Sequence, residues 1–161
     1  FYAVTIYPHA STDGDTIGTL NLVAVAQFVL PFRVVVRNIT FSVAVLEVGK
    51  FAGLGIYSVA RNRLVHSGAV SVATTGIKTA SVTAVTLEPG VYFFAWTLDG
   101  LTASLNAVPN LTQGTTAVIA SEVATRFGFA TNVSVAGVLP ATLGGIGENL
   151  TFLLPICYME P

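Results

Sequence analysis

Charged side chains are scarce in this chain. They make up 9% of its 161 residues, with seven basic and eight acidic residues and a formal net charge of -1. Globular domains are usually about one-quarter charged. Two explanations fit this low charge. Either uncharged polar side chains form the exposed surface, or much of the surface is buried against partners, as in a tightly packed oligomer. The arginine pairs Arg33/Arg37 and Arg61/Arg63 are too small for a nucleic-acid footprint, so we expect no nucleic-acid partner.

Cysteine occurs once, as Cys157, so the chain cannot form an internal disulfide. This residue lies in the apolar run LLPICY, which indicates a buried structural side chain rather than a catalytic thiol. The longest strongly apolar run, from Leu20 to Phe32, has 13 residues. A membrane-spanning helix needs about 20, so we expect no membrane insertion. Because the chain begins with Phe1 rather than Met, we expect it to be a fragment or a processed product.

Most of the chain consists of short apolar runs that alternate with turn residues, which is typical of antiparallel strands. The clearest pattern runs from Ile39 to Val45, where four apolar residues alternate with Thr40, Ser42 and Ala44. Successive side chains of a strand point to opposite faces, so this pattern predicts a strand with one buried face.

The stretch from Val91 to Leu98 carries apolar residues on both faces. Tyr92, Phe94 and Trp96 share one face, and Val91, Phe93 and Ala95 share the other. This pattern predicts a central strand buried on both sides, and the alternative is an aromatic sugar-binding platform. We expect this strand to form a hairpin with the segment from Ala80 to Leu87. Pro89 would then start a type II turn in which Gly90 takes a positive φ.

The remaining runs predict further strands, and a turn at Arg61-Asn62 in which Asn tolerates the left-handed backbone. We expect the last run to place Leu150, Phe152, Leu154, Ile156 and Tyr158 on one face, with Pro155 at an edge or breaking the ladder. A short helical turn is expected after Thr102. The predicted fold is a single domain over residues 1–161, an all-β antiparallel β-sandwich that is jelly-roll-like, with about eight strands. We expect the first strand, Tyr2 to Tyr7, to pair with this final run. The other expected strands are Leu20 to Leu30, Leu54 to Ala60, Arg63 to Val72 and Val118 to Arg126.

No catalytic, cofactor or metal motif stands out. His9, Asp13 and Asp15 fit turn chemistry better than a cation site. His66 and Ser67 are adjacent on a strand, so they point to opposite faces and cannot form a nucleophile–base couple. A glycosidase needs two positioned carboxylates, and no strand pattern brings two of the acids together. We therefore expect no enzymatic activity, no catalytic residue, no cofactor and no metal. The acids are Asp13, Asp15, Glu47, Glu88, Asp99, Glu122, Glu148 and Glu160.

Several short motifs follow one another from Pro31 onward. They are Leu30-Pro31-Phe32, the alternating strand through Phe41, Ala52-Gly-Leu-Gly-Ile-Tyr57, Leu87-Glu-Pro-Gly-Val-Tyr92, Gly137-Val-Leu-Pro140 and Leu154-Pro155. In this order they resemble the C-terminal or knob domains of bacteriophage virion proteins, especially tail-fibre and head-fibre tips. Those domains are similar to trimeric jelly rolls of the tumour-necrosis-factor and C1q kind, where a Pro-Gly-x-Tyr turn also opens an aromatic strand.

The resemblance implies a non-enzymatic structural protein of the virion that forms a homotrimer and contacts other virion proteins. One reading is a fibre or knob for attachment to a receptor or glycan on the host surface. A second is a capsid decoration or cement protein, and a third, of another class, is a carbohydrate-binding module. A long fibrous stem before this chain would favour the fibre, and a short capsid-binding arm would favour decoration. No functional residue carries over, because receptor contacts in such domains lie in variable loops.

Overall fold

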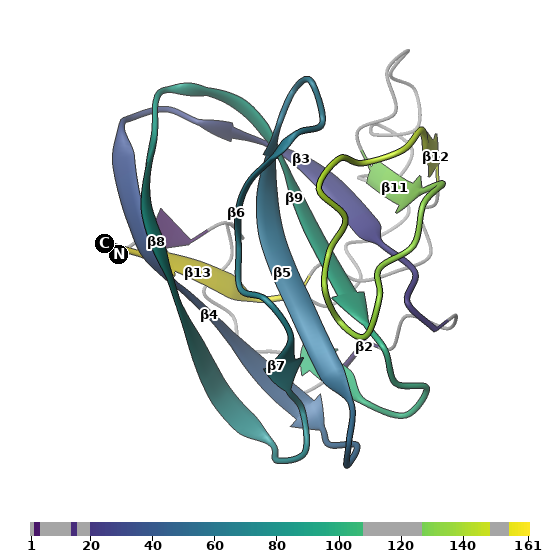
Figure 1. The fold of residues 1–161 in the computed structure, drawn as a ribbon. Helices are drawn as coiled ribbons and strands as arrows, with labels where there is room; N and C mark the ends of the chain where they lie inside the picture. The colour runs from purple at the N-terminus through teal and green to yellow at the C-terminus, as the bar shows by residue number, and fades with distance from the viewer. Residues whose placement is uncertain (1, 4–13, 16–19, 108–126, 149–154) are drawn as a thin grey trace, which may run out of the picture.

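The computed structural model describes residues 2–3, 14–15, 20–107, 127–148 and 155–161. Every regular element in these residues is a strand, and the strands form two antiparallel sheets that pack as a sandwich (Figure 1). The predicted all-β sandwich is therefore confirmed. The described residues contain thirteen strands, where the sequence predicted about eight for the chain, because several strands are only two to four residues long.

The first sheet, which we call sheet A, is built around β4. This strand pairs with β8 along one edge, and with β13 and then β10 along the other, while β1 and β2 extend the sheet beyond them. Its strands are β1 (Tyr2–Ala3), β2 (Gly14–Asp15), β4 (Val34–Val45), β8 (Gly76–Leu87), β10 (Ser104–Asn106) and β13 (Cys157–Glu160).

The second sheet, sheet B, has the order β12-β11-β3-β9-β5-β6, with the short strand β7 also paired to β5. The central strands β3, β9 and β5 pair over most of their length. Its strands are β3 (Ala24–Leu30), β5 (Phe51–Ser58), β6 (Arg63–His66), β7 (Val70–Ser71), β9 (Gly90–Leu98), β11 (Phe127–Ala130) and β12 (Ile146–Glu148).

A hydrophobic core fills the space between the two sheets. Ile39, Phe41 and Val43 reach it from β4, and Phe94 and Trp96 reach it from β9, with Trp96 only 1% exposed. The period-two prediction for β4 is thus confirmed from Ile39 to Val43, whereas Val45, the last residue of the strand, is 49% exposed. The same burial rules out the aromatic platform, because Phe94 and Trp96 are core side chains that no sugar can reach.

A second buried cluster lies on the outer side of sheet B. There Val25, Phe93 and Ala95 pack under Leu139 and Leu143, which belong to the segment 131–145. We call this segment the strap, and it passes in yellow-green over β9 and β5 in Figure 1. Strand β9 is therefore buried on both faces, as its apolar pattern predicted.

Hydrogen bonds fix the strap to the strands beneath it. The Tyr57 hydroxyl donates to the Pro140 carbonyl at 2.6 Å, and the Arg63 amide donates to the Ala141 carbonyl at 2.9 Å. At Gly53 the backbones approach so closely that an added Cβ would overlap the Gly137 carbonyl oxygen. Since only glycine leaves that space, the strap and sheet B form one packed unit.

Two predictions about turns are wrong. Strands β8 and β9 do not form a hairpin: β8 pairs with β4 in sheet A, whereas β9 pairs with β3 and β5 in sheet B. The Pro89 turn is a corner between the sheets, and Gly90 begins β9 without a positive φ. The predicted turn at Arg61-Asn62 does join β5 to β6, but the positive φ, 67°, falls on Arg61 rather than on Asn62.

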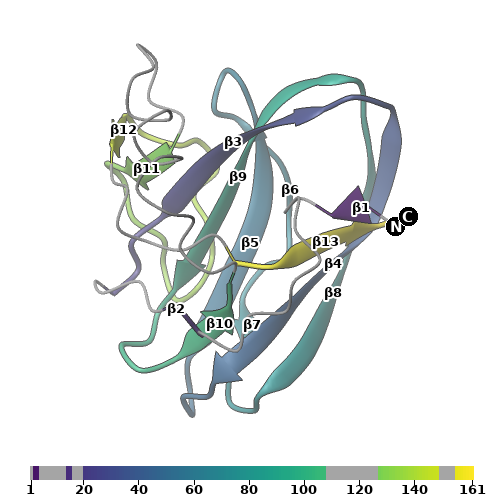
Figure 2. The same cartoon turned by 180° about the vertical axis from the view of Figure 1, so that it is seen from behind.

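The two ends of the chain meet in sheet A, as predicted, where Tyr2 pairs with Met159 (Figure 2). The core-facing residues of β13 are Cys157 and Met159, so the prediction that put Tyr158 on the apolar face is wrong for this strand. β13 begins only after Pro155, which itself forms an isolated bridge with Ala107. Because β13 has partners on both sides, it is not an edge strand.

Some predictions concern other parts of the chain. No helical turn follows Thr102 in the described residues, because its amide is held by a carboxylate and β10 starts at Ser104. The predicted strand from Val118 to Arg126 lies outside the described residues. So do His9, Asp13 and most of the final apolar run.

Candidate functional site

Two acidic side chains hold neighbouring loops together. The Glu47 carboxylate accepts hydrogen bonds from the amides of Thr102 at 2.8 Å and Ala103 at 3.0 Å. These bonds lower the pKa of Glu47 below its usual value. The Asp99 carboxylate accepts from the Phe51 amide. Nothing in the sequence pattern signalled this arrangement, because the residues come from loops far apart in the chain. Both carboxylates thus have a structural role as acceptors for backbone amides.

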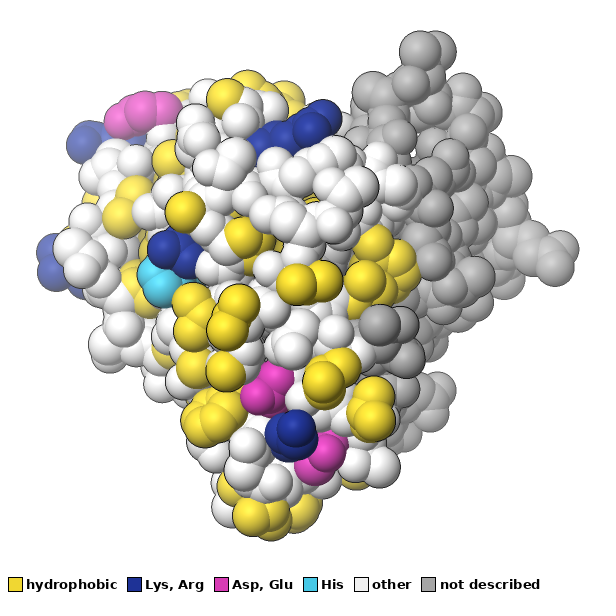
Figure 3. All heavy atoms as spheres, turned by 45° about the vertical axis from the view of Figure 1, so that its right-hand side comes forward, with side chains coloured by type: hydrophobic (Ala, Val, Ile, Leu, Met, Phe, Trp, Pro, Cys, Tyr) yellow, Lys and Arg dark blue, Asp and Glu magenta, His cyan; other side chains and the backbone are white. Residues whose placement is uncertain are grey.

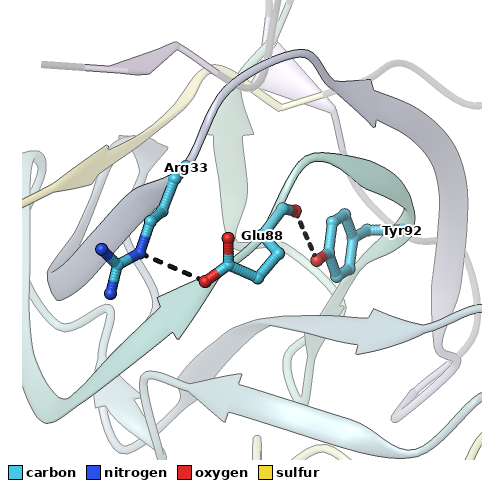
Figure 4. A network of polar contacts seen from close by, with 3 residues as sticks. All are labelled: Arg33, Glu88 and Tyr92. Carbon is cyan, nitrogen blue, oxygen red and sulfur yellow. Dashed lines mark hydrogen bonds and ion pairs between the residues drawn. The ribbon is translucent and has the colours of Figure 1, made fainter.

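A third acid, Glu88, lies at the corner between β8 and β9 (Figure 4). Its carboxylate is 3.1 Å from the Arg33 guanidinium, and its backbone carbonyl accepts a hydrogen bond from the Tyr92 hydroxyl at 2.7 Å. Both charged side chains are largely exposed, so the ion pair adds little to stability. It joins the two connections between the sheets at this end of the sandwich.

The adjacent residues His66 and Ser67 make separate contacts. His66 Nδ1 accepts from the Gly68 amide at 3.1 Å, whereas the Ser67 hydroxyl accepts from the Leu54 amide at 3.0 Å. Partial burial and the positive charge of Arg63 lower the pKa of His66. The two side chains therefore bond to different backbone groups.

The glycine-rich stretch that begins at Gly144 ends the strap. The Gly144 amide donates to the Asn132 side chain at 2.6 Å, which links the two ends of the strap. Within the described part of the chain, no group of three or more His, Cys, Asp or Glu side chains could hold a metal ion.

One end of the sandwich carries a cluster of exposed aliphatic side chains on four loops, which we call the aliphatic end. Val48 is 79% exposed and Val135 is 73% exposed. Figure 3 shows hydrophobic side chains gathered around a few charged ones on the lower part of the molecule. The members are Leu20, Val45, Leu46, Val48, Leu101, Val133, Val135 and Val138.

Hydrogen bonds link the four loops of the aliphatic end into one structure. Glu47 joins the β4–β5 turn to the loop after β9, as described above. The Asn21 amide donates to the Leu98 carbonyl at 3.0 Å, and the Ser134 amide donates to the Asn21 carbonyl at 2.8 Å. Inside, the hydroxyls of Ser134 and Thr97 are 2.7 Å apart. The exposed aliphatic groups are thus held in place before any partner arrives.

A second surface covers the outer side of sheet A, whose strands β13, β4 and β8 can be seen in Figure 2. Many of its outward positions carry hydroxyl or amide side chains, and we call these residues the hydroxyl face. The Thr40 and Thr79 hydroxyls are 2.9 Å apart, and the Ser81 hydroxyl donates to the side-chain amide oxygen of Asn38 at 3.1 Å. The members are Asn38, Thr40, Ser42, Thr79, Ser81 and Asn106.

Comparison with known proteins identifies no relative. No protein-family model matches the chain, and neither a curated protein nor a solved structure matches it. A search of the described residues finds no helix long and apolar enough to cross a membrane. A proposed function therefore rests on the resemblance in the short motifs and on the two surfaces.

Proposed function

We propose that this chain is a non-enzymatic structural domain of a bacteriophage virion that acts as a fibre or knob in host attachment. In this proposal it forms a homotrimer, contacts other virion proteins and needs no metal or cofactor. The resemblance in the short motifs gives the class of protein, and the two-sheet sandwich is compatible with it. The observation that carries the proposal is the aliphatic end.

The aliphatic end has the properties of an association surface. Large exposed apolar patches on soluble domains mark contacts with other molecules, because burying them removes apolar area from water. The acids within it, Glu47 and Asp99, already accept hydrogen bonds from backbone amides. A partner that covers them therefore removes less of their hydration. The loops are ordered beforehand, which lowers the entropic cost of binding.

Light scattering at several protein concentrations tests this proposal. We expect a trimer whose mass does not change with concentration. Val48→Lys and Val135→Lys place a charge in the aliphatic end and should reduce the mass to that of a monomer. Val29→Lys is the matched control, because Val29 is 70% exposed but lies on β3, outside the aliphatic end. This variant should remain trimeric.

A wild-type chain that stays monomeric at every concentration would contradict the trimer. The capsid-decoration alternative would then lead, because the aliphatic end could dock on a shell instead of on other copies. Co-sedimentation of the monomer with phage capsids distinguishes that case, and Val48→Lys should abolish it.

A further inference from the structure

The hydroxyl face differs from an ordinary solvent-facing sheet surface. Exposed sheet faces usually carry lysine, glutamate and arginine. Here the outward positions at the middle of β4 and β8 hold mostly hydroxyl and amide groups. Two charged residues of opposite sign lie beside them: Arg37, in the irregular stretch of β4, and Glu160, which pairs with Asn38. A polar surface with so little net charge favours an uncharged polar ligand.

The polar groups of the hydroxyl face are ordered by one another. Besides the two pairs between β4 and β8, the Asn106 amide donates to the Ser42 hydroxyl at 2.8 Å. A hydroxyl offers one donor and two acceptor sites, so a bonded pair keeps capacity for a further partner. A ligand would meet these groups chiefly at Thr79 and Ser81, which are exposed and already ordered, whereas Thr40 is only 8% exposed.

Apolar groups flank these polar rows. In the register of the sheet, Thr40 lies between Thr79 on β8 and Tyr158 on β13. Tyr158 is partly exposed on the outer side of the sheet, since Cys157 and Met159 point into the core. Ile77, which pairs with Ser42, is 76% exposed. The face thus combines hydroxyl groups with an aromatic ring and an aliphatic side chain.

We propose that the hydroxyl face binds a neutral polysaccharide. Sugar hydroxyls can exchange hydrogen bonds with serine, threonine and asparagine without the cost of desolvating a charge. The C–H surface of a sugar ring can pack on Tyr158 and Ile77. An anionic polymer would find no cluster of basic side chains here. This proposal rests on the proposed role in host attachment and names the class of receptor.

Affinity electrophoresis of the full chain tests the proposal. The gels contain dextran, laminarin or yeast mannan as neutral probes, and polygalacturonate as the anionic probe. We expect at least one neutral polymer to retard wild-type protein. Thr79→Val and Ser81→Ala, which remove hydroxyls with little change in shape, should together weaken retardation at least tenfold. Thr75→Val, in the exposed turn before β8, is the matched control and should bind normally.

Thermal melting confirms that each variant is folded before binding is compared. The proposal is overturned if no neutral polymer retards the protein, if only polygalacturonate does, or if the Thr79 and Ser81 variants bind like wild type. Val48→Lys tests the trimer of the proposed function, whereas the Thr79 and Ser81 variants test only sugar binding, so the two proposals can fail separately. Loss of the trimer in Val48→Lys together with unchanged binding in the Thr79 and Ser81 variants would leave the attachment domain standing and reject the hydroxyl face as its sugar site.

Discussion

The two outer faces of the sandwich have opposite characters. The outer face of sheet B is apolar, and the strap covers it so completely that Val25 is fully buried. The outer face of sheet A is polar, and its β8 side chains Thr79 and Ser81 are exposed, whereas Thr40 beside them on β4 is only 8% exposed. The difference shows that the strap belongs to the fold, since without it one face of sheet B would present hydrophobic side chains to water.

The largest effect should come from shortening a side chain under the strap. Phe93→Ala removes a buried ring and leaves a cavity, which should lower the free energy of unfolding by about 3 to 5 kcal/mol. Thr79→Ala on the open face is the matched change, and it should alter stability by about 0.5 kcal/mol or less. Urea unfolding of both variants measures the contrast. Equal losses would mean that the two faces do not differ as described.

A smaller loss is expected where the strap touches the backbone of sheet B. Gly53→Ala introduces a methyl group that overlaps the Gly137 carbonyl, so the strap must shift. We expect a loss of about 2 to 3 kcal/mol. Gly147→Ala in β12 is the control, because its added methyl would meet its nearest neighbour at 3.9 Å, an ordinary contact. Thermal unfolding that is the same for both variants would speak against the close approach.

A single hydrogen bond between the strap and β5 should contribute less again. Tyr57→Phe removes the hydroxyl that donates to the Pro140 carbonyl. We expect the free energy of unfolding to fall by about 1 kcal/mol, because the ring stays packed and only the bond is lost. Hydrogen exchange in residues 139–143 should accelerate more than exchange in β4. Unchanged exchange in the strap would show that this bond does not hold it.

The smallest effect concerns the aliphatic end and depends on pH. Because the pKa of Glu47 is lowered in the folded chain, its stabilising contribution is complete above the unfolded value near 4.5. It is lost as the pH falls through the lower, folded value. The amides of Thr102 and Ala103 should then exchange faster, after correction for intrinsic rates. Glu47→Gln should show the faster exchange at neutral pH, with no acid-dependent step.

The burial of a strand was predictable from sequence wherever the alternation of its own side chains assigns each residue to one face. Alternation from Ile39 to Val45 gave the inner and outer sides of β4, and the two-sided apolar pattern gave the burial of β9. Both follow from the two-residue period of a strand, which needs no knowledge of the partner.

Other features depend on distant parts of the chain. A Pro-Gly turn looks the same whether it closes a hairpin or crosses between sheets, so the separation of β8 from β9 could not be inferred locally. The strap has no periodic pattern, although its leucines complete a core. The loops joined by Glu47 and the rows formed by Thr40 with Thr79 require the register of the sheet. The candidate surfaces therefore emerged only from the structure.

Cysteine labelling tests the central contrast between the two faces most directly. Cys157 is the native cysteine, and its burial raises the pKa of its thiol, so it should react slowly with iodoacetamide. Two variants add a second thiol, Ser81→Cys on the open face and Val25→Cys under the strap. We expect Ser81→Cys to react as fast as an unstructured peptide and Val25→Cys only after unfolding. Equal rates, or a protected thiol at position 81, would contradict an open hydroxyl face opposite a sealed one.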